Sequence, residues 1–310
     1  MDRHDVEWTG YIPAITTPFA RDGALDLDAL AGQLGWMIEQ RLHGIILAGT
    51  SGEWFSMDAA ERAALFAESV KLAGEHMWVL GGCNAFTQKE AIEHAKAAER
   101  AGMDGILVTP PPYMVPNRRE IVKFYRDISD ATEIPMVVYN WPRGCIVDMD
   151  TDTLAELAEI DNVVAIKNST GNFAGFLEGM YALEHKVRYF GTPTSPLGAD
   201  LALLGHGDGL MGSGAPLGAD HPDFWRAIAE GDRERAIALG TRDRVVMTSW
   251  FRPDYGAQFG NQQAIMKTAL RLQGVSAGYV REPLLELTDD EVARVEATLH
   301  ELGIETVPLS

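Results

Sequence analysis

The sequence predicts an α/β protein: a (β/α)8 TIM barrel with a C-terminal helical extension. Short apolar and often β-branched runs alternate with longer segments of helical period from Ile12 to Glu230. The alternation gives eight strand–helix units, which favours a closed parallel barrel over an open doubly wound sheet. After Glu230 the strand-like runs stop, and no Pro/Ser-rich linker follows. We therefore expect a barrel over residues 1–230 and a helical extension packed on it over residues 231–310.

Each expected strand is a short apolar run, and each expected helix spaces its apolar residues three and four apart. In chain order, the expected strands are Ile12–Thr17, Gly44–Ala48, Trp78–Gly82, Gly105–Thr109, Met136–Tyr139, Val163–Lys167, Val187–Phe190 and Gly209–Met211. The expected helices are Leu27–Gln40, Ala59–Ala73, Gln88–Ala101, Arg118–Ala131, Thr151–Glu159, Phe173–Leu183, Pro196–Leu204 and Pro222–Glu230, then Asp232–Met247, Gln262–Gln273 and Asp289–Leu302.

Local signals mark several of these helix ends. Asp58 is followed three residues later by Glu61, and Thr87 by Glu90, which is the capping-box pattern of a helix start. Gly74 and Gly102 each directly follow an expected helix, as glycine often does at helix C-termini.

The charge balance of the 310-residue chain limits its partners. Lys and Arg number 26 and Asp and Glu number 45, so the formal net charge is −19. Nucleic acids and anionic membrane surfaces both draw their affinity from clustered basic residues, so we expect neither as a partner. An anionic small molecule remains compatible, because a local field can oppose the global charge.

Cysteine and histidine usage disfavours several classes of site. Cys83 and Cys145 are the two cysteines, too few for a disulfide scaffold or a zinc site made of cysteines. The eight histidines show no metal-ligand spacing, so we expect no metal. We see no signal peptide and no apolar run long enough for a membrane span, and we expect a cytoplasmic protein.

Lys167 is the most informative candidate residue, because it closes the apolar strand Val163–Lys167. Catalytic groups of such barrels lie at the C-terminal ends of strands. Burial lowers the pKa of a lysine, and a neutral amine attacks a ketone or aldehyde to form a Schiff base. The alternative is a strand-end lysine that reaches solvent or pairs with a carboxylate.

Two neighbouring strand ends supply further candidates. Tyr139 ends the strand before that of Lys167, and its phenol could carry protons; it could equally be a core tyrosine. The loop Gly49–Glu53 offers hydroxyls and backbone N–H groups, so Thr50 and Ser51 could hold a carboxylate or an oxyanion. A tight turn before a helix cap explains the same segment as well.

Four motifs in order resemble the dihydrodipicolinate synthase and N-acetylneuraminate lyase superfamily of class I, pyruvate-type aldolases. The resemblance runs from about Tyr11 to Leu302. The separation between its tyrosine and lysine is 167 − 139 = 28 residues, as the family pattern requires. The motifs are Gly49-Thr50-Ser51-Gly52-Glu53, Tyr113-Met114-Val115-Pro116, Val138-Tyr139-Asn140-Trp141-Pro142 and Ile166-Lys167-Asn168-Ser169-Thr170-Gly171.

The resemblance implies roles for these residues. Lys167 would form an imine with pyruvate or another 2-oxo acid, and Tyr139 would shuttle protons through Thr50. Tyr113 would reach across from a neighbouring subunit of a homotetramer built as a dimer of dimers. Thr50 and Ser51 would hold the carboxylate of the 2-oxo acid, an aldehyde would be the second substrate, and no cofactor beyond the lysine would be needed.

Departures from the family pattern bear on the second substrate. The synthases carry a carboxylate-binding arginine where this chain has Gly144, with Arg143 one residue earlier. The sugar-acid lyases carry acidic residues after strand seven, where this chain reads Gly191-Thr192-Pro193-Thr194-Ser195. We name Gly191, Arg143, Trp141 and Ser169 as further substrate-binding candidates. Trp54 and Phe55 are, with Trp141, candidates for an apolar wall around the second substrate, although packing between helix and barrel explains Trp54 and Phe55 slightly better. We also expect the segment 250–255 to reach the mouth of the barrel.

These observations lead to one functional prediction with open alternatives. We expect a Schiff-base-forming lyase or synthase that makes or cleaves a C–C bond to a 2-oxo acid, with sialic acid disfavoured as substrate. The alternatives are 4-hydroxy-tetrahydrodipicolinate synthase and a 2-keto-3-deoxy sugar acid dehydratase. A catalytically silent sensor or scaffold is the non-enzyme alternative.

Overall fold

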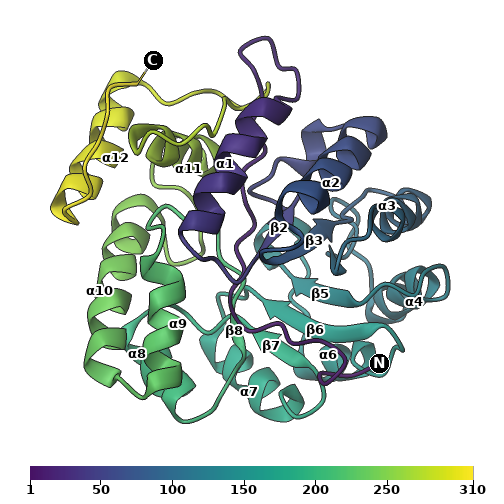
Figure 1. Ribbon diagram of the computed structural model, residues 1–310. Helices are drawn as coiled ribbons and strands as arrows, with labels where there is room; N and C mark the ends of the chain where they lie inside the picture. Colours follow the sequence, from purple (N-terminus) through teal and green to yellow (C-terminus); the bar gives the residue numbers. More distant parts are fainter. Residues whose placement is uncertain (310) are drawn as a thin grey trace.

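Eight parallel strands form the centre of the computed structural model, which describes residues 1–309 (Figure 1). The strands follow one another around the sheet in the order β1-β8-β7-β6-β5-β4-β3-β2. A backbone bridge between Ala14 and Ile46 joins the two ends of this order, so the sheet closes into the predicted barrel. The strands are β1 Gly10–Tyr11, β2 Gly44–Leu47, β3 Trp78–Gly82, β4 Gly105–Val108, β5 Met136–Asn140, β6 Val163–Asn168, β7 Arg188–Phe190 and β8 Gly209–Leu210.

The first strand is shorter than the sequence predicts. The predicted strand Ile12–Thr17 is wrong in position, because β1 covers Gly10–Tyr11 and the predicted range contains only isolated bridges at Ala14. Pro13 explains the break, because it has no N–H to donate to a neighbouring strand. Its carbonyl still accepts a hydrogen bond from the Ile46 N–H at 2.8 Å, which keeps the segment beside β2.

Helices surround the barrel, as the alternating pattern predicts. They are α1 Leu27–Glu39, α2 Ala59–Ala73, α3 Gln88–Ala101, α4 Arg118–Ser129, α5 Pro142–Cys145, α6 Thr151–Leu157, α7 Phe173–Leu183, α8 Pro196–Leu203, α9 Asp220–Glu230, α10 Arg233–Trp250, α11 Gln262–Leu272 and α12 Asp289–Glu301. The capping boxes at Asp58 and Thr87 form as expected. A short helix Trp54–Ser56 and α5 were not expected, and both follow strand ends that line the site.

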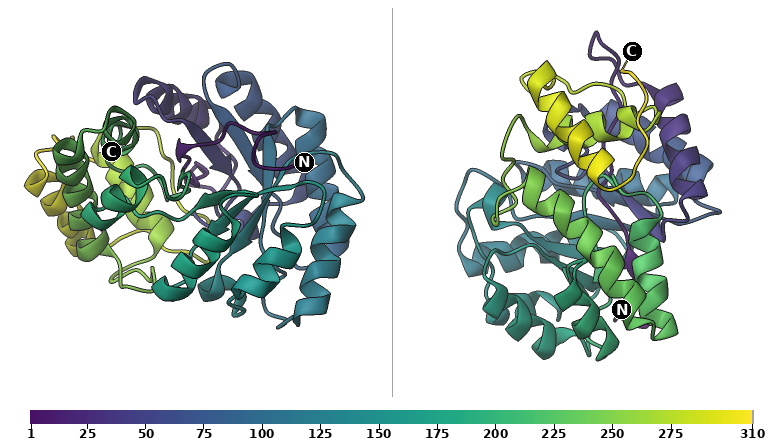
Figure 2. Two further views of the ribbon diagram at one scale, coloured as in Figure 1. Left: turned by 90° about the horizontal axis from the view of Figure 1, so that it is seen from below. Right: turned by 90° about the vertical axis from the view of Figure 1, so that its left-hand side faces the viewer.

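The last three helices lie together on one side of the barrel (Figure 2). α10 packs against α8 and α9, and α12 packs against α10 and α11. Trp250 is fully buried between them, and its indole N–H donates to the Thr298 hydroxyl at 3.1 Å. The first residues of α11 reach back to the β2 end of the barrel, which makes this helix part of the site described below.

Two kinds of feature are absent from residues 1–309. No helix there is long and apolar enough to cross a membrane. The same residues contain no group of three or more His, Cys, Asp or Glu side chains placed to hold a metal ion.

Candidate active site

Lys167 lies inside the barrel and has no acidic partner among the described residues. It pairs in register with Tyr139 of the adjacent strand, and only 5% of the residue is exposed. Its ammonium nitrogen lies 4.1 Å from the centroid of the Tyr139 ring, and no carboxylate of residues 1–309 is within ion-pair distance. Lys167 therefore neither reaches solvent nor forms an ion pair.

Burial alone lowers the pKa of Lys167 to about 7. The cause is desolvation, because the charged ammonium loses water without gaining an opposite charge. At neutral pH a large fraction of the amine is then uncharged, with a free lone pair. Such an amine can attack a carbonyl carbon, whereas an ordinary lysine is almost entirely protonated.

The Tyr139 phenol is held next to this amine by two hydroxyl groups. Burial raises its pKa well above the ordinary value, while hydrogen bonds from Ser169 and Thr50 oppose the rise. The phenol therefore stays protonated at neutral pH and belongs to a chain of three hydroxyls. A chain of this kind can pass a proton along its members, provided that each rotates its O–H bond.

A cavity of about 130 Å³ opens onto Lys167 and Tyr139. It is more enclosed than a surface groove, and its walls come from the ends of β2, β5, β6, β7 and β8 and from α9, α10 and α11. The sequence-predicted residues that line it are Lys167, Tyr139, Thr50, Ser51, Ser169, Gly191 and Trp141. Phe251 and Tyr255, from the segment predicted to reach the mouth, also line it.

Two predicted site residues do not line this cavity in the single chain. Tyr113 is 90% exposed, so its side chain lies on the surface and contributes nothing to the site of its own chain. Arg143 forms an exposed ion pair with Asp254 at 2.7 Å. Trp54 and Phe55 also lie outside the cavity lining; Trp54 stacks at an angle on Phe86.

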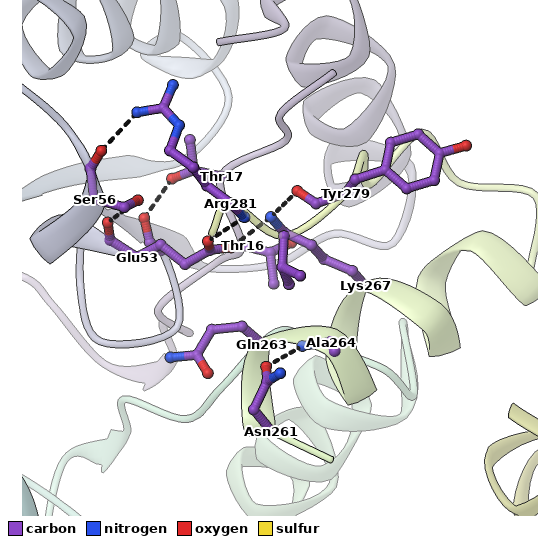
Figure 3. Close-up of polar contacts among 12 residues, drawn as sticks. Thr16, Thr17, Glu53, Ser56, Asn261, Gln263, Ala264, Lys267, Tyr279 and Arg281 are labelled. Atoms are coloured by element: carbon purple, nitrogen blue, oxygen red, sulfur yellow. Dashed lines mark hydrogen bonds and ion pairs between the residues drawn. The ribbon is translucent and has the colours of Figure 1, made fainter. Parts of the chain in front are cut away.

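Hydrogen bonds join the loop that carries Thr50 and Ser51 to α11, and Figure 3 shows Glu53 of this loop with Lys267 of α11. The Gln263 amide donates to the Thr50 carbonyl at 2.9 Å. Lys267 donates to a carboxylate oxygen of Glu53 at 2.5 Å, and both side chains are fully buried. The backbone N–H of Arg281 donates to the second Glu53 oxygen at 3.0 Å. These contacts fix the loop although Glu53 adopts a left-handed φ of 55°, which is costly for a non-glycine residue.

Other cavity residues were not predicted from the sequence. Gln262 donates to the hydroxyls of Ser51 and Ser213 at 3.2 and 2.8 Å. His221 and Asp243 line the cavity from α9 and α10 and are paired at 2.9 Å. No motif marks these residues, because they come from helices whose apolar period points to packing.

Comparison with known proteins agrees with this geometry. Residues 7–302 match the dihydrodipicolinate synthetase family. A 4-hydroxy-tetrahydrodipicolinate synthase of Neisseria meningitidis serogroup B is 33% identical over 296 residues, covering 95% of this chain and 98% of the relative. The crystal structure of a chloride-inhibited dihydrodipicolinate synthase of Acinetobacter baumannii, complexed with pyruvate, is 28% identical with a TM-score of 0.85; the match covers 96% of this chain and 99% of that one.

A further structure shares the fold. Dihydrodipicolinate synthase from Aquifex aeolicus superposes with a TM-score of 0.87 at 24% identity, over 97% of this chain and 100% of that chain.

Proposed function

This chain belongs to the dihydrodipicolinate synthetase family and is a lyase of the class I aldolase type, and from this premise we propose that it makes or cleaves a C–C bond between a 2-oxo acid such as pyruvate and an aldehyde, through an imine on Lys167. The observation that carries the proposal is a buried lysine, facing a cavity, with no acidic partner among residues 1–309. No cofactor is needed, because the protonated imine formed from the amine and the 2-oxo acid supplies the electron sink.

The imine step follows from the state of Lys167. The neutral amine attacks the keto carbon, a C–N bond forms, and the carbonyl electron pair moves to oxygen. That oxygen takes up two protons, one of them released by the attacking nitrogen, and leaves as water while the nitrogen lone pair forms the C=N bond of a protonated imine. Loss of a proton from the adjacent carbon gives the enamine. Its carbon then attacks the aldehyde carbon, and the aldehyde oxygen takes a proton; water finally releases the product from Lys167. Cleavage is the same sequence in reverse.

The hydroxyls around Tyr139 suit these proton transfers. The phenol stays protonated at neutral pH and is hydrogen-bonded to Thr50 and Ser169. It is therefore a proton donor beside the nitrogen that attacks the keto group. Thr50 and Ser51 lie on the adjacent wall, where their hydroxyls and the backbone of the loop suit the carboxylate of the 2-oxo acid.

A second candidate for the reaction is 4-hydroxy-tetrahydrodipicolinate synthesis, which the names of the relatives support. The arginine that the synthases use for the second substrate is replaced here by Gly144, and Arg143 is paired with Asp254 instead. A bidentate Arg–carboxylate contact is geometrically demanding, so a shift by one residue weakens it. This departure favours a different aldehyde.

The proposal extends to assembly. Tyr113 is 90% exposed, and Met114 and Val115 beside it are exposed apolar residues, so this loop offers a surface for a second copy of the chain. A homotetramer built as a dimer of dimers would place Tyr113 near the relay of another subunit. Light scattering should give about four times the 33.9 kDa chain mass; a monomeric, fully active protein would contradict the assembly.

The imine can be trapped directly. Incubation with pyruvate and borohydride, followed by intact-mass measurement, should show one pyruvyl adduct per chain. Lys167→Ala should abolish the adduct, while Lys267→Arg, a change at the other buried lysine, should retain it. No adduct on the unmodified protein would contradict the proposed function. An adduct without turnover on any aldehyde would favour the silent sensor.

A further inference from the structure

Three aromatic rings form a connected row that starts beside the Lys167 nitrogen. The Tyr139 ring has its centroid 4.1 Å from that nitrogen and stacks on the Trp141 indole at 5.8 Å, with planes 23° apart. Trp141 in turn contacts Tyr255, with ring centroids 6.1 Å apart and planes tilted by 44°. All three residues line the cavity, and we call Tyr139, Trp141 and Tyr255 the aromatic wall. A molecule joined to Lys167 therefore begins at one end of this wall.

Trp141 keeps its place in the aromatic wall because residue 144 is a glycine. A Cβ atom at Gly144 would lie 2.5 Å from Cδ1 and 2.6 Å from Nε1 of the indole, well inside the roughly 3.5–4 Å of a favourable contact. Gly144 belongs to the short helix α5, and its φ is not positive, so alanine adopts the same backbone conformation without strain. The position therefore requires glycine for the indole and not for the backbone.

Tyr255 is held at the other end of the aromatic wall by a strained turn. Its φ of 63° lies in the left-handed region, which is costly for a bulky residue other than glycine. Its N–H donates to the Arg252 carbonyl at 2.9 Å, and the Arg252 N–H donates to the Gly256 carbonyl at 2.7 Å. Backbone strain of this kind persists where the surrounding structure fixes it, and it clusters at binding sites. Here the strained residue is one whose ring contacts Trp141 and lines the cavity.

The cavity supplies apolar surface but no basic partner for a second carboxylate. Of the described residues that line it, Lys167 is the one lysine or arginine, and the proposed imine uses its nitrogen. A carboxylate that loses water without gaining a partner binds poorly, whereas a flat apolar group binds well against aromatic rings. Further apolar side chains in the lining are Leu210, Val246, Met247, Phe251 and Met266.

Resting on the proposed function above, we propose that the aromatic wall is the subsite for the second substrate, and that it takes an aldehyde with an aromatic, uncharged body. Gly144 is then a specificity-determining position, because a side chain there displaces Trp141 from the wall. The chemistry at Lys167 is unchanged: the enamine carbon bonds to the aldehyde carbon and the aldehyde oxygen takes the proton. Trp141 and Tyr255 select the substrate and take no part in bond making.

Three aldehydes test the subsite in the unmodified protein. They are benzaldehyde, cyclohexanecarbaldehyde and 4-carboxybenzaldehyde, each assayed by aldehyde-dependent pyruvate consumption. The value of kcat/KM for benzaldehyde should exceed that for 4-carboxybenzaldehyde about tenfold or more, because the charged group finds no basic partner in the cavity. Benzaldehyde and cyclohexanecarbaldehyde have the same number of carbon atoms, so the ratio of their kcat/KM values reports on the flat ring.

Variants separate the subsite from the imine chemistry. Trp141→Leu should lower the benzaldehyde-to-cyclohexanecarbaldehyde ratio about 2- to 10-fold, the range of one aromatic contact, and the intrinsic reactivities of the aldehydes cancel when proteins are compared. Tyr255→Leu should lower the ratio in the same direction. Gly144→Ala should do so as well, because the added methyl group displaces the indole. Gly35→Ala is the matched control and should leave the ratio unchanged, because Gly35 is exposed in α1 and an added Cβ there meets nothing within 4 Å.

The outcomes distinguish the two proposals. A pyruvate adduct without turnover of benzaldehyde, or with 4-carboxybenzaldehyde used equally well, overturns the subsite and leaves the imine intact. A ratio unchanged in Trp141→Leu or in Gly144→Ala does the same. Absence of an adduct on the unmodified protein overturns both. The adduct also reports folding of each variant; if Trp141→Leu and Gly144→Ala form none, the ratio in Tyr255→Leu decides, and an unchanged ratio there overturns the subsite.

Discussion

Two lysines are buried in this molecule, and they have opposite surroundings. Lys167 ends β6, faces the cavity and has no acidic partner among residues 1–309. Lys267 of α11 is fully buried against Glu53, and its ammonium also donates to the Tyr279 carbonyl at 2.6 Å. Burial lowers the pKa of both, to about 7 and about 8, and at Lys267 the Glu53 carboxylate opposes that drop.

The carboxylate and the donor geometry decide what each amine can do. The Lys267 amine has no lone pair free to attack a carbonyl group, because its N–H groups donate to Glu53 and Tyr279 inside packed protein. It therefore acts as a structural cross-link between α11 and the loop that carries Thr50. Lys167 is buried without an acidic partner among residues 1–309, so its charged form is destabilised and its neutral form can act as a nucleophile. Burial of a lysine is therefore a poor guide to function unless its partners are known.

Breaking the structural pair should have the largest effect on stability. Lys267→Met leaves the Glu53 carboxylate buried without a partner, which should cost about 3–5 kcal/mol in free energy of unfolding. Lys167→Met leaves no orphan charge and should cost little, so it is the matched control. Urea unfolding at neutral pH measures both. Equal losses in the two variants would contradict the contrast between the lysines.

Removing the Tyr139 hydroxyl should affect turnover more than imine formation. Tyr139→Phe keeps the ring beside Lys167 but removes the central member of the hydroxyl chain. We expect turnover to fall about 100-fold or more, the contribution of a positioned proton donor, while the borohydride-trapped pyruvate adduct persists in part. Loss of the folded state in this variant would instead show that the tyrosine is mainly structural.

How much of the contrast between the two lysines can be predicted from the sequence depends on how far apart in the chain the contacting residues lie. Lys167 was found because its whole strand is apolar and because Tyr139 ends the preceding strand. The partner of Lys267 lies 214 residues away, and no local pattern links it to Glu53. For the same reason, no local pattern in the sequence marks Gln262, His221 and Asp243 as site residues.

The ends of strands and helices show how far neighbouring residues in the sequence can predict secondary structure. The barrel and most helix starts followed from periodicity and capping residues. The position of β1 did not, because the effect of Pro13 depends on which neighbour its missing N–H would have faced.

The pH dependence of imine formation should follow the titration of Lys167, the buried lysine without an acidic partner among residues 1–309. The neutral fraction of Lys167 grows as pH rises through about 7, so the rate of adduct formation should increase about tenfold per unit below that point and level off above it. The free energy of unfolding should also rise with pH. The folded pKa lies below the unfolded value of about 10.4, so the unfolded chain binds more protons between these values and stability rises with pH across that window.

A carboxylate supplied to Lys167 should make it resemble Lys267. Ser169 lines the same cavity and bonds the Tyr139 phenol, so Ser169→Asp brings a negative charge close to the amine. An opposite charge at such a distance raises a lysine pKa by about 1–3 units, and the midpoint of adduct formation should move up by that amount. Ser169→Asn is the uncharged control. A midpoint that stays near 7 in the aspartate variant would show that the charge does not reach the amine.

The smallest effect should come from Arg143, which resembles neither lysine because it is exposed and paired with Asp254 on the surface. Exposed ion pairs contribute about 0–1 kcal/mol, so Arg143→Ala should leave the unfolding curve almost unchanged. The informative readout is the KM for a carboxylate-bearing aldehyde against that for its neutral analogue. If Arg143 stays with Asp254, both KM values should remain within about twofold of the parent. A selective rise for the carboxylate would show that the arginine leaves Asp254 to bind substrate, and would restore the synthase reading of this site.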